Sequence, residues 1–449
     1  MKWSRYSHFF RSKRNGYLLY NSASGFFLKV EDEGVKDIEN IIKDPEGFDF
    51  SEMPGLYMTL RRAGFIVEDT TDDDYYNILK MKRISANYVT RTLLLTIAVT
   101  RNCNFNCSYC YEGNRTGYPM SKEVEDKLMD FIDLHKREDQ LAIIWYGGEP
   151  LLAIDRIRSI DKRLKEKGRK YNAFLVTNGY LLTEDIIADL NDLSINRIQI
   201  TLDGSRNTHD SRRYQVSGKG SFDVILSNLE KLMASDYSGI VNIRVNVDMR
   251  NRDEYKDVYH LIKERFPDTY GDRIWVYPGY VKGDGHPDAS CFFDSVLTGK
   301  FVADLAENDE INAMPLLPQK TMGGCTLTKR CAYVVGPDGE LYKCWDDVGI
   351  PEMVVGHIDD MSNWNMPLIA RGMTGCSYLD SPVCKECFYF PVCDGGCHKI
   401  RLRNLMDGGD RDCCSYFRDS LDDLLELHYE QKMRAEKNKA EEKRSANEP

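Results

Sequence analysis

Three cysteines lie within eight residues of this chain, in the segment CNFNCSYC at 103–110. Their C-x3-C-x2-C spacing supplies one thiolate fewer than the four that normally hold a four-iron cluster. Ten further cysteines lie between residues 325 and 414, and Cys291 stands alone. In a reducing compartment such clustering indicates metal binding, and the scarcity of histidine among these cysteines favours iron–sulfur clusters.

Length, charge and hydropathy limit the number of domains, the partners and the cellular location that we expect. The chain has 449 residues, which is enough for two to four domains. A net charge of −11 argues against non-specific nucleic-acid binding. No apolar run is long enough to span a membrane, and the basic N-terminus lacks the apolar stretch of a signal peptide. We therefore expect a cytoplasmic protein with no membrane or nucleic-acid partner.

The first 85 residues contain no cysteine and have their own pattern. Residues 16–30 predict two strands joined by a polar turn. Residues 34–43 and 55–64 predict short amphipathic helices, and 65–69 a third strand. The acidic run at 69–77 indicates a linker or the start of a helix. Residues 1–85 are thus predicted to form a small α+β unit of winged-helix type.

A second pattern begins near residue 93. Short apolar runs alternate with amphipathic stretches, which is typical of parallel βαβ units. The predicted strands are 93–99, 141–146, 173–177, 197–202, 240–247 and 273–278. The predicted helices are 121–135, 154–166, 184–192, 222–234 and 254–265. We expect an α/β fold, a partial TIM-like barrel of six βα units.

Each unusual motif follows a predicted strand. The cysteine segment follows the first, GGEP (147–150) the second, TNG (177–179) the third and LDG (202–204) the fourth. In a parallel barrel these loops share one mouth. Glu149 could accept from an amine there, Thr201 and Asp203 could bind hydroxyls, and Arg213 could meet a carboxylate. Together they describe an amino-acid nucleoside.

This set of motifs resembles the radical S-adenosylmethionine (SAM) enzymes. The resemblance implies a four-iron cluster on Cys103, Cys107 and Cys110, whose open iron binds SAM. It also implies that SAM is cleaved to a 5′-deoxyadenosyl radical, which abstracts hydrogen from a substrate. The residues that the resemblance assigns to SAM are Tyr109, Gly147, Gly148, Glu149, Asn178, Thr201, Asp203, Arg213 and Asn246. The Arg213 assignment competes with the adjacent Arg212.

The later cysteines resemble the SPASM extension of these enzymes, which holds two auxiliary four-iron clusters. By position, the first cluster would use Cys325, Cys331, Cys344 and Cys397. The second would use Cys384, Cys387, Cys393 and Cys414, with Cys413 as the alternative to Cys414. Cys291 and Cys376 are left over as small buried hydrophobes, although a ligand swap at Cys376 stays open.

The resemblance divides the chain into a leader-recognition element at 1–85, a radical SAM core at 90–305, a SPASM domain at 310–425 and a charged tail at 426–449. An N-terminal element of this kind binds a leader peptide as an added edge strand. The leading hypothesis is a maturase that oxidises a ribosomally made precursor peptide. It would form a thioether or a carbon–carbon cross-link, with flavodoxin or ferredoxin as the electron donor.

Three alternatives stay open. An anaerobic sulfatase maturase, which makes formylglycine, would share the barrel and both auxiliary clusters. Its chemistry needs an acidic base that the sequence does not identify, with Asp294 only a guess. A non-catalytic iron–sulfur protein that binds peptides ranks lower. Structural zinc could replace iron, either at the first three cysteines with a distant fourth thiol or in the 325–414 segment.

Overall fold

The computed structural model describes residues 1–112, 117–281, 291–308, 311–312, 314–318, 320 and 322–445. The chain folds into two compact units. The barrel unit comprises residues 87–293 and 325–376, and the terminal unit comprises residues 1–86, 294–324 and 377–449. Over the described part of the chain, every helix is too short or too polar to cross a membrane.

The barrel unit is built on one sheet with the strand order β11-β10-β9-β8-β7-β6-β12-β13-β14. Its six long strands are parallel and follow one another in chain order. They are β6 (Thr92–Thr100), β7 (Gln140–Gly147), β8 (Tyr171–Val176), β9 (Ile195–Thr201), β10 (Ile240–Val247) and β11 (Ile274–Tyr280). Because β6 and β11 do not pair with each other, the barrel stays open, and the predicted partial barrel is confirmed.

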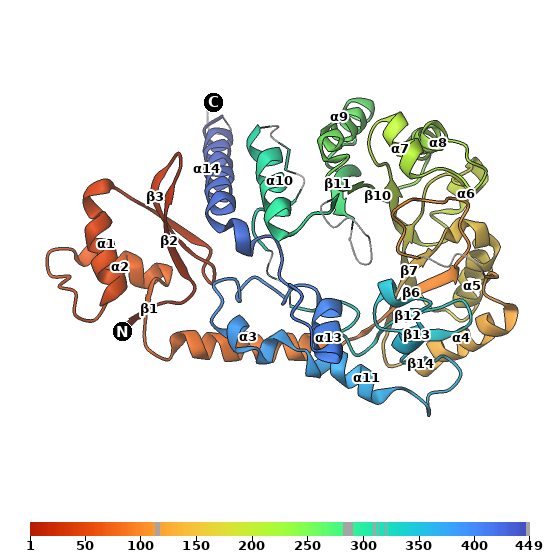
Figure 1. Ribbon diagram of the computed structural model, residues 1–449, viewed down its shortest axis with the longest axis horizontal. Coiled ribbons are helices and arrows are strands. Elements are labelled where there is room, and N and C mark those ends of the chain that lie inside the picture. The colour runs from red at the N-terminus through yellow and green to blue at the C-terminus, as the bar shows by residue number, and fades with distance from the viewer. Residues whose placement is uncertain are drawn as a thin grey trace. The chain divides into compact units, whose positions relative to one another are not determined.

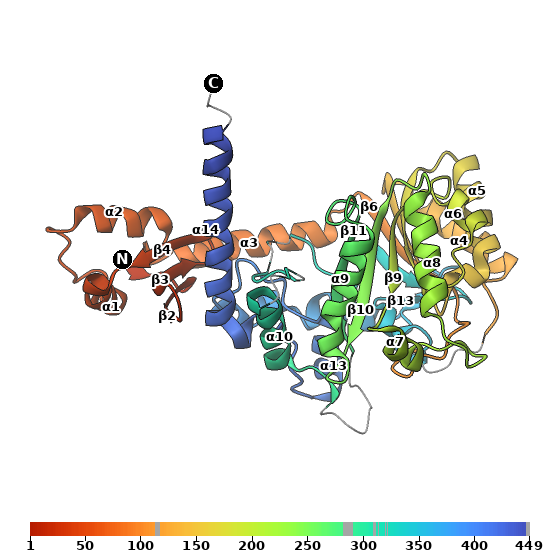
Figure 2. The same cartoon turned by 90° about the horizontal axis from the view of Figure 1, so that it is seen from above.

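Helices connect successive strands and cover the convex side of the sheet (Figures 1 and 2). They are α4 (Lys122–Leu134), α5 (Ile154–Glu166), α6 (Glu184–Asp189), α7 (Arg206–Arg212), α8 (Phe222–Ala234) and α9 (Tyr255–Arg265). Alternate strand residues such as Leu175, Ile200 and Ile243 are fully buried. A period of two places the intervening residues on the opposite, concave side.

Three short strands extend the sheet beyond β6, in a region where no strand was predicted. The strand β12 (Ala332–Val335) runs parallel to β6, and β13 (Glu340–Tyr342) and β14 (Gly356–His357) follow antiparallel. The helix α11 (Met366–Ala370) completes this part. The predicted 310–425 range is therefore divided between the two units, because these strands complete the sheet of the barrel unit.

The terminal unit contains the predicted N-terminal elements. An antiparallel sheet has the order β2-β3-β4, and β1 pairs with β5. The strands are β1 (Lys2–Trp3), β2 (Ser7–Ser12), β3 (Gly16–Asn21), β4 (Phe26–Val30) and β5 (Ile66–Val67). The helices are α1 (Val35–Lys43), α2 (Pro54–Ala63), α3 (Thr71–Tyr88), α10 (Ser295–Asn308), α12 (Pro382–Lys385), α13 (His398–Asp407) and α14 (Leu421–Ser445). The strand β2 was not predicted, the acidic run begins α3, and the charged tail is helical through residue 445.

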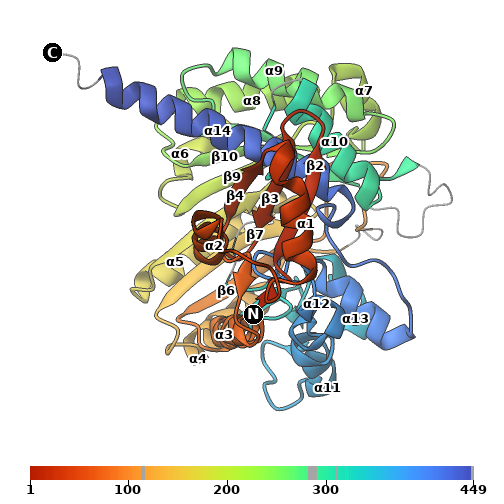
Figure 3. The ribbon, with the colours of Figure 1, turned by 90° about the vertical axis from the view of Figure 1, so that its left-hand side faces the viewer.

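The sheet β2-β3-β4 has a core on each face. Leu19 packs with Ile38 and Leu60 of α1 and α2, the helices in front of the sheet in Figure 3. Its neighbour Leu18 points to the opposite face of the sheet, where it packs with Leu424 of α14 and with residues 387–393. Because strand side chains alternate, one apolar run, GYLLYN, supplies both cores.

Candidate active site

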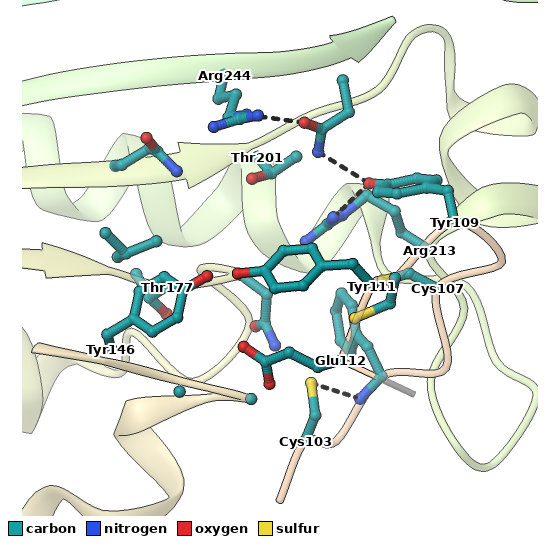
Figure 4. Close-up of a pocket in the computed structure, with 18 of the residues that line it drawn as sticks. Cys103, Cys107, Tyr109, Tyr111, Glu112, Tyr146, Thr177, Thr201, Arg213 and Arg244 are labelled. Carbon is teal, nitrogen blue, oxygen red and sulfur yellow. Dashed lines mark hydrogen bonds between the residues drawn. The ribbon is translucent and has the colours of Figure 1, made fainter. Parts of the chain in front are cut away.

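The carboxyl ends of the parallel strands surround one cavity of about 410 Å3 in the barrel unit (Figure 4). Cys103, Cys107 and Cys110 all line it. The other predicted site residues that line it are Tyr109, Gly147, Gly148, Asn178, Thr201, Arg213 and Asn246. The structure therefore brings together residues from four loops that are far apart in the sequence.

Strand residues on the concave side form the wall of the cavity. Pairs two residues apart contribute from neighbouring strands, namely Phe174 and Val176, Gln199 and Thr201, and Arg244 and Asn246. Sequence reasoning missed Gln199 and Arg244. The available signal was a polar residue at every second position of otherwise apolar strands, which indicates a concave side facing a ligand rather than a packed core.

Gly147 and Gly148 are required by the chain's own backbone. Gly147 has φ +125°, and a Cβ there would lie 2.1 Å from the Thr100 carbonyl oxygen. A Cβ on Gly148 would lie 2.4 Å from the Asn102 carbonyl oxygen. These glycines therefore make room for the start of the cysteine loop, and they also line the cavity. Their predicted contact with SAM stays a prediction.

Glu149 is fully buried behind the cavity wall. Its carboxylate accepts hydrogen bonds from the Thr177 hydroxyl at 2.7 Å, the Asn178 amide at 2.7 Å and the Leu151 amide at 3.0 Å. Burial raises the pKa of Glu149. The carboxylate joins the ends of β7 and β8, and its predicted contact with a bound amine stays a prediction.

Tyr109 is the centre of a buried polar network. Its hydroxyl donates to Asp203 and accepts from Arg213 Nη1 at 2.6 Å and Asn246 Nδ2 at 3.0 Å. Asp203 is fully buried, and its carboxylate also accepts a hydrogen bond from the backbone N–H of Asn246 at 2.8 Å. Asp203 therefore orients residues that line the cavity, and its predicted contact with ribose stays a prediction.

The two adjacent arginines have different partners. Arg212 forms an ion pair with Asp248 at 2.8 Å and lies over the Tyr109 ring. Arg213 lines the cavity. The geometry therefore favours Arg213 over Arg212 as the ligand-binding arginine. His209 is fully buried, accepts from the Asp203 amide at 3.1 Å and is placed as a structural partner.

The first three cysteines suit a metal cluster rather than free thiols. Burial raises the pKa of the Cys103 thiol to about 12. A bound metal would supply positive charge that stabilises a thiolate there. No three His, Cys, Asp or Glu side chains of the described residues converge as the ligands of a single metal ion. A four-iron cluster spaces its thiolates more widely, because each binds a different iron.

Further aromatic and acidic groups complete the cavity. Tyr146 of β7 stacks on Trp345, with ring centroids 5.9 Å apart and planes at 16°. Asp346 lines the cavity beside them, and Tyr111 projects into it (Figure 4). Sequence reasoning missed these residues, although Tyr146 precedes GGEP directly and Trp345 and Asp346 follow Cys344 directly.

Three of the four cysteines predicted for the first auxiliary cluster, Cys325, Cys331 and Cys344, belong to the barrel unit. The Cys331 thiol donates to Glu138 at 3.3 Å. The buried Lys343 ammonium donates to the Ala332 carbonyl at 2.7 Å. The fourth predicted ligand, Cys397, belongs to the terminal unit, so this ligand set stays a prediction.

The cysteines predicted for the second auxiliary cluster, Cys384, Cys387, Cys393 and Cys414, all belong to the terminal unit. The Cys397 amide donates to the Cys413 carbonyl at 2.8 Å. A Cβ on Gly396 would lie 1.9 Å from that carbonyl oxygen. The loop before Cys397 thus packs directly on the Cys413–Cys414 segment, and the choice between these two cysteines stays open.

The remaining cysteines and the guessed base lie elsewhere. Cys376 is buried in the barrel unit and its thiol donates to the Gly372 carbonyl at 3.4 Å. Cys291 is partly buried. The Asp294 carboxylate accepts from the Leu297 amide at 2.7 Å, at the start of α10 in the terminal unit. Asp294 therefore caps a helix of the terminal unit, and its role as a base stays a prediction.

Comparison with known proteins places this cavity in context. Residues 97–280 match the Radical SAM superfamily. The chain is 24% identical over 359 residues to the cysteine-type anaerobic sulfatase-maturating enzyme of Clostridium novyi (strain NT). That alignment covers 72% of this chain and 93% of the relative.

Two solved structures share the fold. One is native anSMEcpe with bound AdoMet and the Cp18Cys peptide, with a TM-score of 0.58 and 20% identity over 77% of this chain and 99% of that chain. The other is Streptococcus suis SuiB bound to precursor peptide SuiA, with a TM-score of 0.53 and 14% identity. It covers 92% of this chain and 99% of that chain.

Proposed function

Because the chain carries a radical SAM domain, we propose that this enzyme oxidatively cross-links a ribosomally made precursor peptide. The bond formed would be a thioether or a carbon–carbon link between side chains. The observation that carries the proposal is the sheet β2-β3-β4, which the sulfatase-maturase chemistry does not need. Similarity to the SuiB complex extends over 92% of the chain, against 77% for anSMEcpe.

The residues around the cavity fit SAM and a four-iron cluster. Cys103, Cys107 and Cys110 would hold the cluster, and they supply three thiols to a space that also exposes polar groups. The residues proposed to hold SAM from the cavity wall are Tyr109, Gly147, Gly148, Asn178, Thr201, Arg213 and Asn246. When bound, these cofactors supply the 5′-deoxyadenosyl radical that abstracts hydrogen from the peptide.

The chain's own groups orient the reaction and exclude water. Tyr109 and Asp203 hold Arg213 and Asn246 in place, so these donors are preorganised before a ligand arrives. The stacked rings of Tyr146 and Trp345 cover part of the cavity with apolar surface. The substrate residue would lie against these rings.

Asp346 is the carboxylate that we propose as proton acceptor. An oxidative cross-link removes a proton as well as a hydrogen atom, so a base must be near the reacting carbon or sulfur. Asp346 lines the same cavity as the three cysteines. We propose Asp346 in preference to Asp294, whose carboxylate accepts a hydrogen bond at the start of α10.

The N-terminal sheet would bind the leader of the precursor peptide. Its edge strands are β2 and β4, and an edge strand offers unpaired amides and carbonyls to an added strand. The two auxiliary clusters would take up the electron left by the two-electron oxidation. A flavodoxin or ferredoxin would supply the electron that starts each turnover.

A second candidate is an anaerobic sulfatase maturase, favoured by the relative of that name that aligns over 72% of this chain. Asp346 would serve that reaction equally well. The two functions differ in their product, because one makes a cross-link within a peptide and the other converts a single cysteine or serine to an aldehyde.

Mass spectrometry of the anaerobically reconstituted enzyme tests the proposal. With SAM, a strong reductant and a precursor peptide encoded beside the gene, we expect 5′-deoxyadenosine and a peptide that has lost two hydrogens at two linked residues. Aldehyde formation in a sulfatase-derived peptide, with no reaction of the precursor, would assign the second function. Absence of 5′-deoxyadenosine from cluster-loaded protein would leave only a non-catalytic iron–sulfur protein.

Asp346→Asn tests the proposed base. We expect 5′-deoxyadenosine to persist while the cross-linked product falls by about 100-fold, a typical loss for a general base. Asp294→Asn is the matched control, because asparagine also caps helices. Product formation by Asp346→Asn at the wild-type rate would remove Asp346 from the mechanism.

A further inference from the structure

Arg401 of α13 holds its guanidinium against the cysteines of the terminal unit. Its Nη2 donates to Cys384 Sγ at 3.4 Å, and its Nε donates to the Gly395 carbonyl at 2.6 Å. Two contacts from one planar group fix its orientation. The side chain is only partly exposed, so water does not fully screen its charge.

The loop that receives Arg401 also contacts a second cysteine. The Gly395 amide donates to Cys393 Sγ at 3.3 Å. Gly395 has φ +92°, and a Cβ there would lie 2.3 Å from the Tyr378 ring, so the loop has little freedom to move. Arg401 thus contacts Cys384 directly, and Gly395 links its guanidinium to Cys393.

Two acidic side chains, Asp394 and Asp412, lie near the same cysteines. Asp412 lies beside the cysteine pair, but it forms an ion pair with Arg418 at 2.9 Å and accepts from the Cys414 amide at 2.9 Å. Asp394 precedes Gly395 and also contributes negative charge near Cys393. Arg401 donates directly to a sulfur, which a carboxylate cannot do.

We propose that Arg401 raises the reduction potential of the second auxiliary cluster. The inference rests on the proposed function, in which Cys384, Cys387, Cys393 and either Cys413 or Cys414 hold that cluster. A reduced cluster carries one more negative charge than the oxidised one. A positive charge and an N–H···S hydrogen bond therefore stabilise the reduced form. Arg401 would make this cluster a better acceptor for the electron left over from substrate oxidation.

Redox titration followed by electron paramagnetic resonance tests the proposal. The full-length protein with Cys103, Cys107 and Cys110 replaced by alanine would carry only auxiliary clusters, and adding Cys384→Ala identifies the signal of the second. We expect a lower midpoint potential for that signal in Arg401→Gln. The Arg401→Lys variant keeps the charge on a shorter and more mobile side chain. Its midpoint potential should lie between those of Arg401→Gln and the wild-type protein.

Arg411→Gln is the matched control, because Arg411 lies two residues before Cys413 but pairs with Asp407 on the exposed end of α13. Its midpoint potential should equal that of the wild-type residue. Equal potentials for both Arg401 variants, at full iron content, would overturn the inference. If Arg401→Gln loses iron, the Arg401→Lys variant provides the test. A midpoint potential of Arg401→Lys equal to that of the wild-type protein would then overturn the inference. Iron content unchanged by Cys384→Ala would instead refute the second cluster.

Discussion

At the scale of single residues, the site depends on a close approach of two backbones. The cysteine loop leaves β6 so near the end of β7 that the Gly148 amide donates to the Thr100 carbonyl at 3.1 Å. Gly147 and Gly148 have no Cβ to separate these segments. This contact fixes the start of the loop that carries the three cysteines to the cavity.

Gly147→Ala should therefore cost roughly 3 kcal/mol or more in the free energy of unfolding, because it adds backbone strain at φ +125° to a clash with Thr100. Gly168→Ala is the control. Gly168 has φ +66° with nothing within 4 Å of an added Cβ, and should lose only about 1 kcal/mol. Urea denaturation of both variants measures the difference. Equal losses would show that the close approach is not what requires Gly147.

At the scale of elements, α4 and α5 are joined by a buried carboxylate. Glu125 of α4 is fully buried and accepts from Arg163 Nη1 at 2.8 Å, from the Ser159 hydroxyl at 2.8 Å and from Arg156. Burial opposes its charge, but these donors lower the pKa of Glu125 to about 2. The pair of helices therefore depends on an ionised glutamate.

This pairing predicts a specific loss of stability in acid. A carboxyl group whose pKa is lowered on folding stabilises the protein above its unfolded pKa near 4.5, and that contribution disappears as the pH falls toward 2. Because water and salt screen these ion pairs, we expect a contribution of about 1–2 kcal/mol. The test compares the urea midpoints of the cluster-free wild-type protein and Glu125→Gln from pH 6 downward. The two midpoints should differ at pH 6 and converge between about pH 4.5 and 2. A constant difference would contradict the prediction.

At the scale of the whole molecule, the terminal unit joins segments from both ends of the chain through one sheet. Leu18 and Leu19 are adjacent and both fully buried. Leu18 packs with α14 and residues 387–393, whereas Leu19 packs with α1 and α2. The proposed leader-binding element is therefore part of the same core as the segment at 384–414.

Leu18→Ala and Leu19→Ala should each cost about 2–5 kcal/mol, but in different places. We expect Leu18→Ala to speed amide hydrogen exchange in α14 and in residues 384–397, and to lower the iron retained there. Leu19→Ala, the same change in volume, should speed exchange in α1 and α2 instead. Identical exchange patterns would show that the two cores are not distinct.

Much of the site could be predicted from the chain because its signals are local. Short apolar runs marked all six parallel strands, and the three cysteines, GGEP and TNG each followed one of them. Gln199 and Arg244 had a local signal that was missed, whereas Trp345 and Asp346 could not be placed in this way. Trp345 and Asp346 follow β13, which pairs with β12, and β12 in turn pairs with β6, more than two hundred positions away in the sequence.

The sequence by itself determined where the cysteines gather along the chain, where the strands run, and that the loops after the strands meet at one mouth. These follow from side-chain period and from the geometry of parallel strands, which any local stretch expresses. Only the tertiary structure decided that Glu149 is buried and hydrogen-bonded to Thr177 and Asn178. It also decided that Arg213 and not Arg212 lines the cavity, and that Arg401 donates to Cys384. Those outcomes depend on contacts between distant segments, and a burial or a hydrogen bond exists only once both partners are in place.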